Sequence, residues 1–140
     1  MATSQEPVRI GRVNRGTERA LGISLTGETN IYMKADDLDR FAAKKPDSYL
    51  KLLEEIASII KTPDFVSFDA EEEAITYIKH YFHGGMFHGV YIRIRHKGRP
   101  AKWIFEKLVT GDKTSIPPMF GSSAFVRPQY KRIPEGDKGV

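Results

Sequence analysis

The stretch from Phe65 to Thr110 decides the fold, because it holds four strand-like segments with turn signals between them. The segments read FVSF (65–68), AITYIKHYF (74–82), GVYIRIRH (89–96) and KWIFEKLVT (102–110). Apolar and basic residues alternate in the third segment, and a period of two is typical of a strand with one buried and one solvated face. The links HGGMFHG and HKGRP favour turns, so consecutive antiparallel pairing is the simplest topology.

Two helices are predicted before this stretch. Asp36 or Asp37 can cap a first helix that ends at Pro46, and Asp47 opens a second helix that ends at Pro63. Apolar residues recur along the second helix at helical spacing and predict a face that packs against a sheet: Tyr49, Leu52, Leu53, Ile56, Ile59 and Ile60.

The whole chain is expected to form a single domain of the α+β class. Residues 8–33 contain short apolar runs between glycines and favour irregular structure with one or two short strands. We therefore predict N-terminal helices packed on a four-stranded antiparallel sheet. The core spans about residues 8–127, and the polar ends at 1–7 and 133–140 are expected to be mobile.

Composition narrows the possible functions. The 140 residues are 40% hydrophobic and include no cysteine, which excludes disulfides, thiolate zinc sites and cysteine nucleophiles. The chain has no apolar run of signal-peptide or membrane-span length, so we expect a cytoplasmic protein without membrane association. Walker, GxGxxG, GxSxG and HExxH motifs are absent from the sequence, which leaves metal-independent chemistry on RNA, or binding, as the main possibilities.

The charge distribution favours an anionic partner. The formal net charge is +4, and from His88 onward eleven Lys or Arg residues face four Asp or Glu residues. Such an asymmetry produces a positive face that attracts an anionic polymer, although a merely solvated surface has the same composition.

Several side chains of the strand-rich stretch suit phosphate chemistry. Arg93 and Arg95 can clamp a phosphate and stabilise the charge of a transition state. His80 or His83 can act as acid or base, and without a nearby carboxylate they predict no metal site. Glu106 is either a general base or an ion-pair partner of Lys107 or Arg93.

The order of four segments resembles a phage-associated family of the barnase, EndoU, colicin and RelE-like nuclease superfamily. The segments are IYMKADDLDRFAAKKP (31–46), IIKTPDFVSF (59–68), ITYIKHYF (75–82) and GVYIRIRHKGRPAKWIF (89–105). The resemblance covers about residues 8–127, and the step IIKTPDFV at 59–66 is its best part. It implies a metal-independent, cofactor-free endoribonuclease that acts on transfer or messenger RNA rather than on DNA and leaves a 2′,3′-cyclic phosphate. It also implies a toxin or phage context, with an inhibitory immunity or antitoxin protein as partner.

The sequence departs from this family at the expected catalytic positions. Arg40 and Lys45 stand where the family tends to have helix histidines, and Glu106 and Lys107 stand where it tends to have an Arg-Thr pair. The colicin and RelE-like branches use Lys, Arg and Tyr side chains instead. The candidate catalytic residues are therefore His80, His83, Arg93, Arg95, Glu106 and Lys45, and the candidate RNA-binding residues are Arg40, Lys102, Lys107, Tyr91 and Arg127. The alternative is a catalytically degenerate relative that only binds nucleic acid or a host or phage protein.

Overall fold

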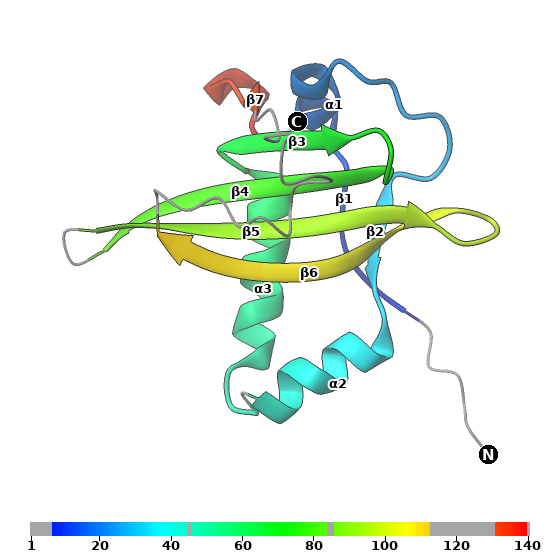
Figure 1. Ribbon diagram of the computed structural model, residues 1–140. Coiled ribbons are helices and arrows are strands. Elements are labelled where there is room, and N and C mark those ends of the chain that lie inside the picture. The colour runs from blue at the N-terminus through cyan, green and yellow to red at the C-terminus, as the bar shows by residue number, and fades with distance from the viewer. Residues whose placement is uncertain (1–6, 45, 84–85, 113–130, 140) are drawn as a thin grey trace.

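The computed structural model describes residues 7–44, 46–83, 86–112 and 131–139, with only the backbone at 49, 82–83, 86–88 and 111–112. These residues form one sheet of seven strands in the order β1-β2-β6-β5-β4-β3-β7 (Figure 1). The strands are β1 (Val8–Arg12), β2 (Asn30–Met33), β3 (Phe65–Asp69), β4 (Ala74–His83), β5 (Met86–Lys97), β6 (Lys102–Asp112) and β7 (Lys131–Arg132).

The central strands β3 to β6 form the antiparallel meander that the sequence predicts. Consecutive strands pair along their length, from Phe65 opposite Ile78 in β3–β4 to Lys97 opposite Lys102 in β5–β6. Gly98, in the turn between β5 and β6, has a φ of 99°, which favours glycine. The strand-like segments of residues 65–110 and the turn signals between them therefore predicted both the strands and their neighbours.

The predicted four-stranded antiparallel sheet is wrong. β1 and β2 extend the sheet beyond β6, β7 extends it beyond β3, and β2 runs parallel to β6. These added strands are two to five residues long, and β1 contains a glycine and a register shift, so they show little alternation. They depend on pairing with the long meander strands rather than on a pattern of their own.

The two predicted helices are confirmed, and a third, shorter helix precedes them. α2 (Ala35–Lys44) and α3 (Tyr49–Lys61) match the predicted segments, whereas α1 (Arg15–Leu21) falls in the part expected to be irregular. The local signals for α1 were present: the Asn14 side chain accepts a hydrogen bond from the Thr17 amide, and Gly22 ends the helix with a φ of 68°.

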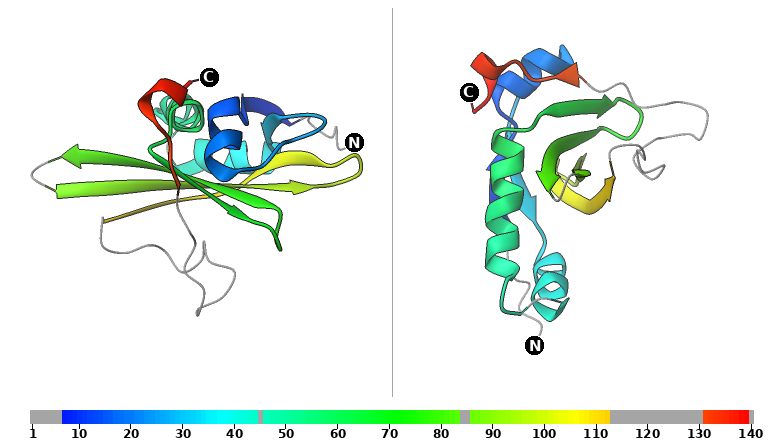
Figure 2. Two further views of the ribbon diagram at one scale, coloured as in Figure 1. Left: turned by 90° about the horizontal axis from the view of Figure 1, so that it is seen from above. Right: turned by 90° about the vertical axis from the view of Figure 1, so that its left-hand side faces the viewer.

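The main core lies between α3 and one face of the sheet. Ile56, Ile59 and Ile60 of α3 are at most 1% exposed, and each such side chain contributes roughly 1.5–3 kcal/mol through burial. They belong to one apolar cluster with residues of every strand from β1 to β6. Figure 2 shows α3 on one side of the curved meander, and the Phe41 ring of α2 meets Phe105 edge to face at 5.8 Å. None of the helices in the described part of the chain has the length and apolar character needed to cross a membrane.

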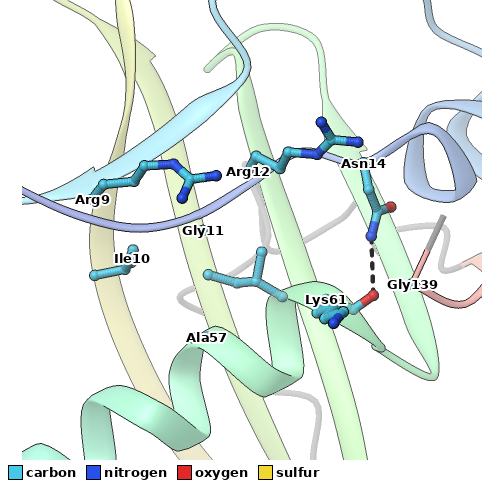
Figure 3. Close-up of a pocket in the computed structure, with 9 residues that line it drawn as sticks. Arg9, Ile10, Gly11, Arg12, Asn14, Ala57, Lys61 and Gly139 are labelled. Atoms are coloured by element: carbon cyan, nitrogen blue, oxygen red, sulfur yellow. Dashed lines mark hydrogen bonds between the residues drawn. The ribbon is translucent and has the colours of Figure 1, made fainter.

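The N-terminal segment is tied to the end of α3. The Asn14 side chain donates a hydrogen bond to the Lys61 carbonyl at 3.0 Å, and the Gly139 amide donates to the same oxygen at 3.1 Å (Figure 3). A Cβ on Gly16 would lie 2.1 Å from the carbonyl oxygen of Asp137. Glycine at this position therefore lets α1 pack directly against the short 3-10 helix η2 (Glu135–Asp137).

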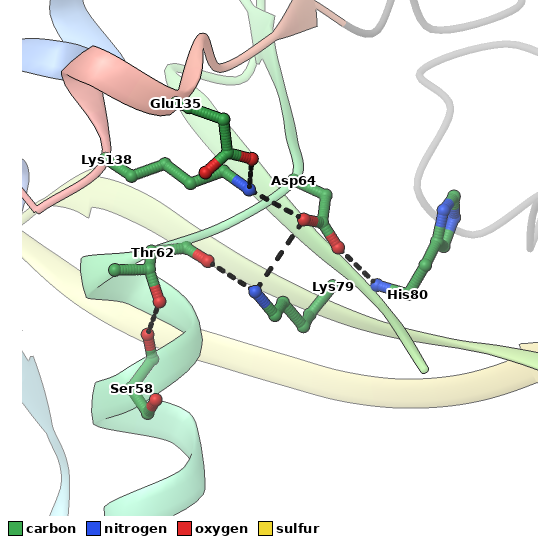
Figure 4. A network of polar contacts seen from close by, with 7 residues as sticks. All are labelled: Ser58, Thr62, Asp64, Lys79, His80, Glu135 and Lys138. Carbon is green, nitrogen blue, oxygen red and sulfur yellow. Dashed lines mark hydrogen bonds and ion pairs between the residues drawn. The ribbon is translucent and has the colours of Figure 1, made fainter. Parts of the chain in front are cut away.

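The C-terminal residues that the sequence favoured as a mobile end make specific contacts. Ile133 is 2% exposed and joins the main core, and the Lys138 ammonium lies 3.1 Å from the Asp64 carboxylate (Figure 4). Lys79 lies 3.6 Å from the same carboxylate, and the His80 amide donates to it at 2.8 Å. Asp64 thus joins the start of β3 to the chain end.

Candidate nucleic-acid interface

Arg93 lies on the sheet face opposite α3, but its side chain is 7% exposed. Its Nε lies 2.7 Å from Oε2 of Glu106, and its Nη2 lies 4.0 Å from the Asp69 carboxylate. A buried guanidinium is costly without such counter-charges. Arg93 therefore acts first as the centre of an ion-pair cluster rather than as a solvated phosphate ligand.

Arg95 extends the same cluster toward solvent. Its side chain is 38% exposed, and its guanidinium contacts Glu72 at 2.5 Å and Glu106 at 3.6 Å. The Glu106 carboxylate consequently bridges both arginines, which realises the ion-pair role that the sequence left open for it with Arg93. Any phosphate that reaches Arg95 has to share it with two carboxylates.

A β-bulge sets the position of Glu106. In the β5–β6 ladder Arg93 pairs with Lys107 while Ile94 pairs with Phe105, so Glu106 is the extra residue of β6. β2 pairs with β6 only at Trp103 and Ile104. From Phe105 onward this edge of β6 has no strand beside it among the described residues, and α2 lies along it instead (Figure 1).

A groove of about 170 Å³ opens between α2 and this edge. It is lined by Asp37, Arg40, Phe41, Lys44, Phe105, Glu106, Lys107 and Leu108. Arg40 pairs with Asp37 within α2 and keeps 71% of its side chain exposed. Within the described chain, Lys44 and Lys107 make no ion pair. The groove thus holds two carboxylates, Asp37 paired with Arg40 and Glu106 paired with Arg93 and Arg95, and two lysines that can meet an anion.

Three of the predicted residues, Arg40, Glu106 and Lys107, meet in this α2–β6 groove, although they come from distant parts of the sequence. The sequence also pointed to Lys45, which lies outside the described residues, and it missed Lys44. The signal for Lys44 was available, because Arg40 and Lys44 are four residues apart and share one face of a helix.

The structure does not bring His80 to the arginines. His80 is opposite Gly89 on β5, whereas Arg93 is opposite Thr76, four residues back along β4. At about 3.3 Å per residue this separates the two by roughly 13 Å along the sheet. The His80 ring instead lies 5.4 Å from the Phe65 ring. The backbone of His83 is farther still, opposite Met86 at the hairpin end, and its side chain lies outside the described residues.

The other predicted RNA-binding residues are dispersed. Tyr91 is 2% exposed and packs with Ile78, Phe65 and Val109 in a second apolar cluster, so its ring offers no surface for stacking on a base. The Lys102 ammonium lies 5.2 Å from the centre of the Tyr32 ring, near the turn that joins β5 and β6. Arg127 lies outside the described residues.

The cluster around Asp64 contains the ammonium groups of Lys79 and Lys138. It differs from the groove because the Asp64 carboxylate already neutralises these cations. Burial alone would raise the pKa of Asp64, but the His80 amide and the Lys138 and Lys79 ammoniums outweigh it and lower the pKa. Hydrogen bonding to Glu135, together with Asp64, raises the pKa of Lys138 despite partial burial. This cluster holds Lys138 against the residue that precedes β3, and the charges of Lys79 and Lys138 are both paired.

Comparison with known proteins adds no assignment. No protein-family model, no curated protein and no solved structure matches the chain. Within the described residues no three His, Cys, Asp or Glu side chains are grouped in a way that could hold a metal ion.

Proposed function

We propose that the protein is a metal-independent endoribonuclease and that its RNA substrate lies in the α2–β6 groove. The observation that carries the proposal is the position of Glu106, whose carboxylate lies 2.7 Å from Arg93 Nε and lines the groove together with Lys44 and Lys107. The other carboxylate of the groove, Asp37, pairs with Arg40. A carboxylate beside phosphate-binding cations is the arrangement that general-base attack by a ribose 2′-hydroxyl requires.

In the proposed reaction Glu106 takes the proton from the 2′-hydroxyl, and the 2′-oxygen attacks the adjacent phosphorus. The bond from phosphorus to the 5′-oxygen of the next nucleotide breaks, which leaves a 2′,3′-cyclic phosphate and a 5′-hydroxyl. The leaving 5′-oxygen receives a proton from an ammonium of the groove, Lys44 or Lys107. Arg40 and the remaining lysine bind the phosphate oxygens, whose charge grows in the transition state.

A second candidate function is RNA binding without cleavage. It is favoured by the contacts of Glu106 with both Arg93 and Arg95, because these ion pairs occupy the carboxylate that the reaction would need. A protein that only binds should show affinity that falls with salt, with a slope set by the number of phosphates contacted, and no cleavage products.

The experiment that separates the two functions is incubation of total RNA with the protein in EDTA. The endoribonuclease proposal expects fragments with 2′,3′-cyclic phosphate ends from the wild type and from Glu54→Gln, a matched change on the exposed side of α3. Folded Glu106→Gln should give almost none. If the RNA stays intact at high concentrations of folded wild-type protein but binds to it in a salt-dependent way, the endoribonuclease proposal is wrong and the binding function is supported. If folded Glu106→Gln cleaves RNA as fast as the wild type, Glu106 is not the general base.

A further inference from the structure

A second pocket, of about 420 Å³, lies away from the α2–β6 groove, at the outer edge of the sheet. Its lining residues come from β1, from the last turns of α3 and from the chain end: Arg9, Ile10, Gly11, Arg12, Asn14, Ala57, Ile60, Lys61 and Gly139. None of these belongs to β2, and β1 is the terminal strand of the sheet, so the pocket lies on the side of β1 that no described strand covers. Figure 3 shows it between β1 and α3.

A bulge in β1 places two arginines on one face. Arg9 pairs with Tyr32 and Arg12 pairs with Asn30, while Ile10 is the extra residue between Arg9 and Gly11. Residues three apart in a regular strand point to opposite faces, so without the bulge the two arginines would be separated by the sheet. Their partners in β2, Tyr32 and Asn30, alternate with the core residues Ile31 and Met33. Arg9 and Arg12 therefore share the face of β1 that points away from α3, and they border the pocket at the open edge of the strand.

The charge of the pocket is uncompensated. Arg9 donates through Nε to the Asn30 side chain at 2.8 Å, a neutral partner that orients the guanidinium without cancelling its charge. Arg12 and Lys61 form no ion pair within the described chain, and none of the nine lining residues is acidic. Three exposed cations thus border one cavity, unlike the neutralised arginines of the meander.

The negative end of the α3 dipole is partly compensated where it borders the pocket. A helix C-terminus carries partial negative charge and would repel one. Here the Lys61 carbonyl accepts hydrogen bonds from the Asn14 side chain and the Gly139 amide, which satisfy it. The Lys61 ammonium adds positive charge at the same turn.

We propose that this β1–α3 pocket binds a phosphate ester of nucleotide size. Guanidinium groups match phosphate oxygens bidentately, and half-buried Ala57 together with the aliphatic stem of Lys61 offers apolar surface to an uncharged ring. The volume falls in the range of small-molecule sites and suits one nucleotide. The same chemistry is offered by a free nucleotide and by the 5′-terminal nucleotide of an RNA. The inference stands independently of RNA cleavage in the groove.

Calorimetric titration with AMP and with adenosine tests the proposal, because the two differ only by the phosphate. We expect AMP to bind at least tenfold more tightly than adenosine, and Arg9→Gln/Arg12→Gln to weaken AMP binding by about tenfold or more. Arg15→Gln is the matched control, since Arg15 is an exposed arginine of α1 outside the pocket lining. It should bind AMP within about twofold of the wild type.

A 2′-O-methylated RNA pentamer, with or without a 5′-phosphate, distinguishes the two sources and cannot be cleaved through its 2′ positions. Tighter binding of the 5′-phosphorylated pentamer than of AMP identifies an RNA end, and tighter binding of AMP identifies a free nucleotide. Three results would overturn the proposal: no binding of AMP or pentamer at millimolar concentrations, equal binding by folded Arg9→Gln/Arg12→Gln, or an equal loss in Arg15→Gln.

Discussion

The carboxylate of Glu106 lies 2.7 Å from Nε of Arg93, whose side chain is 7% exposed. Removing one partner of a buried ion pair weakens the compensation of the other charge, and with Asp69 still 4.0 Å from Arg93 the cost is at most about 3 kcal/mol. We expect Glu106→Gln to lower the free energy of unfolding by up to that amount, measured by urea denaturation. Arg93→Met added to Glu106→Gln should restore part of the loss.

Glu54→Gln on the exposed side of α3 provides the reference for this pair and should stay within about 0.5 kcal/mol of the wild type. If Glu106→Gln were as stable as Glu54→Gln, the Glu106–Arg93 contact would contribute nothing to the fold. The loss of stability also means that cleavage by Glu106→Gln has to be measured where the variant remains folded.

The lowered pKa of Asp64 predicts a pH-dependent contribution to stability. A carboxyl whose pKa is lower in the folded state stabilises the protein above its unfolded pKa, and this contribution is lost as pH falls through the folded pKa. Asp64→Asn should therefore be about 1 kcal/mol less stable than the wild type at neutral pH. The difference should shrink as pH falls below the ordinary value of 3.8.

Urea denaturation of both proteins at neutral pH and at about pH 3 checks this expectation. Asp39→Asn, an exposed change on α2, should show no comparable trend. A gap between wild type and Asp64→Asn that is constant across the range would contradict the role of the Lys138 and Lys79 ion pairs.

Gly16 should tolerate no side chain, because a Cβ there would lie 2.1 Å from the backbone oxygen of Asp137. Gly16→Ala forces α1 and η2 apart and should destabilise the protein by about 1–3 kcal/mol. Gly136→Ala is a suitable control, since a Cβ at Gly136 meets no atom within 4 Å. Equal denaturation midpoints for the two variants would contradict the packing of α1 on η2.

The salt dependence of RNA binding should show whether the groove lysines contact RNA phosphates. Each phosphate contact to single-stranded RNA contributes about 0.7 to the slope of log affinity against log salt. Lys107→Gln should lower the slope by about that amount in anisotropy titrations of a labelled RNA. Lys51→Gln on the exposed side of α3 should leave it unchanged. Identical slopes for wild type and Lys107→Gln would place the RNA elsewhere.

The meander and the two longer helices could be predicted because their patterns are long and locally complete. The strands from β3 to β6 are five to twelve residues long, with turn signals between them, and the apolar stripe of α3 spans its full length. β1, β2 and β7 could not be predicted in the same way. Their pairing depends on neighbours that are distant in sequence, and the parallel contact of β2 with β6 is made by two residue pairs.

The candidate site could be predicted only in part, because its ion pairs depend on how distant strands pair, as Arg93 illustrates. Alternation correctly placed Arg93 opposite the core-facing Ile92 and Ile94, but it carries no information about which carboxylates come from other strands. The bulge at Glu106 and the register opposite Thr76 determine the ion pairs and the distance to His80. The grouping of Arg9 with Arg12 likewise requires a bulge that the sequence pattern did not indicate.

The most direct test of the central claim is the cleavage rate of a labelled RNA in EDTA by wild type, Lys44→Gln/Lys107→Gln and Lys51→Gln. Neither groove lysine has an ion-pair partner in the described part of the chain, so these changes leave the fold largely intact. We predict wild-type cleavage to a 2′,3′-cyclic phosphate, a loss of about a hundredfold or more in the double variant, and no loss in Lys51→Gln. Wild-type rates in the folded double variant would contradict the α2–β6 groove as the site of cleavage.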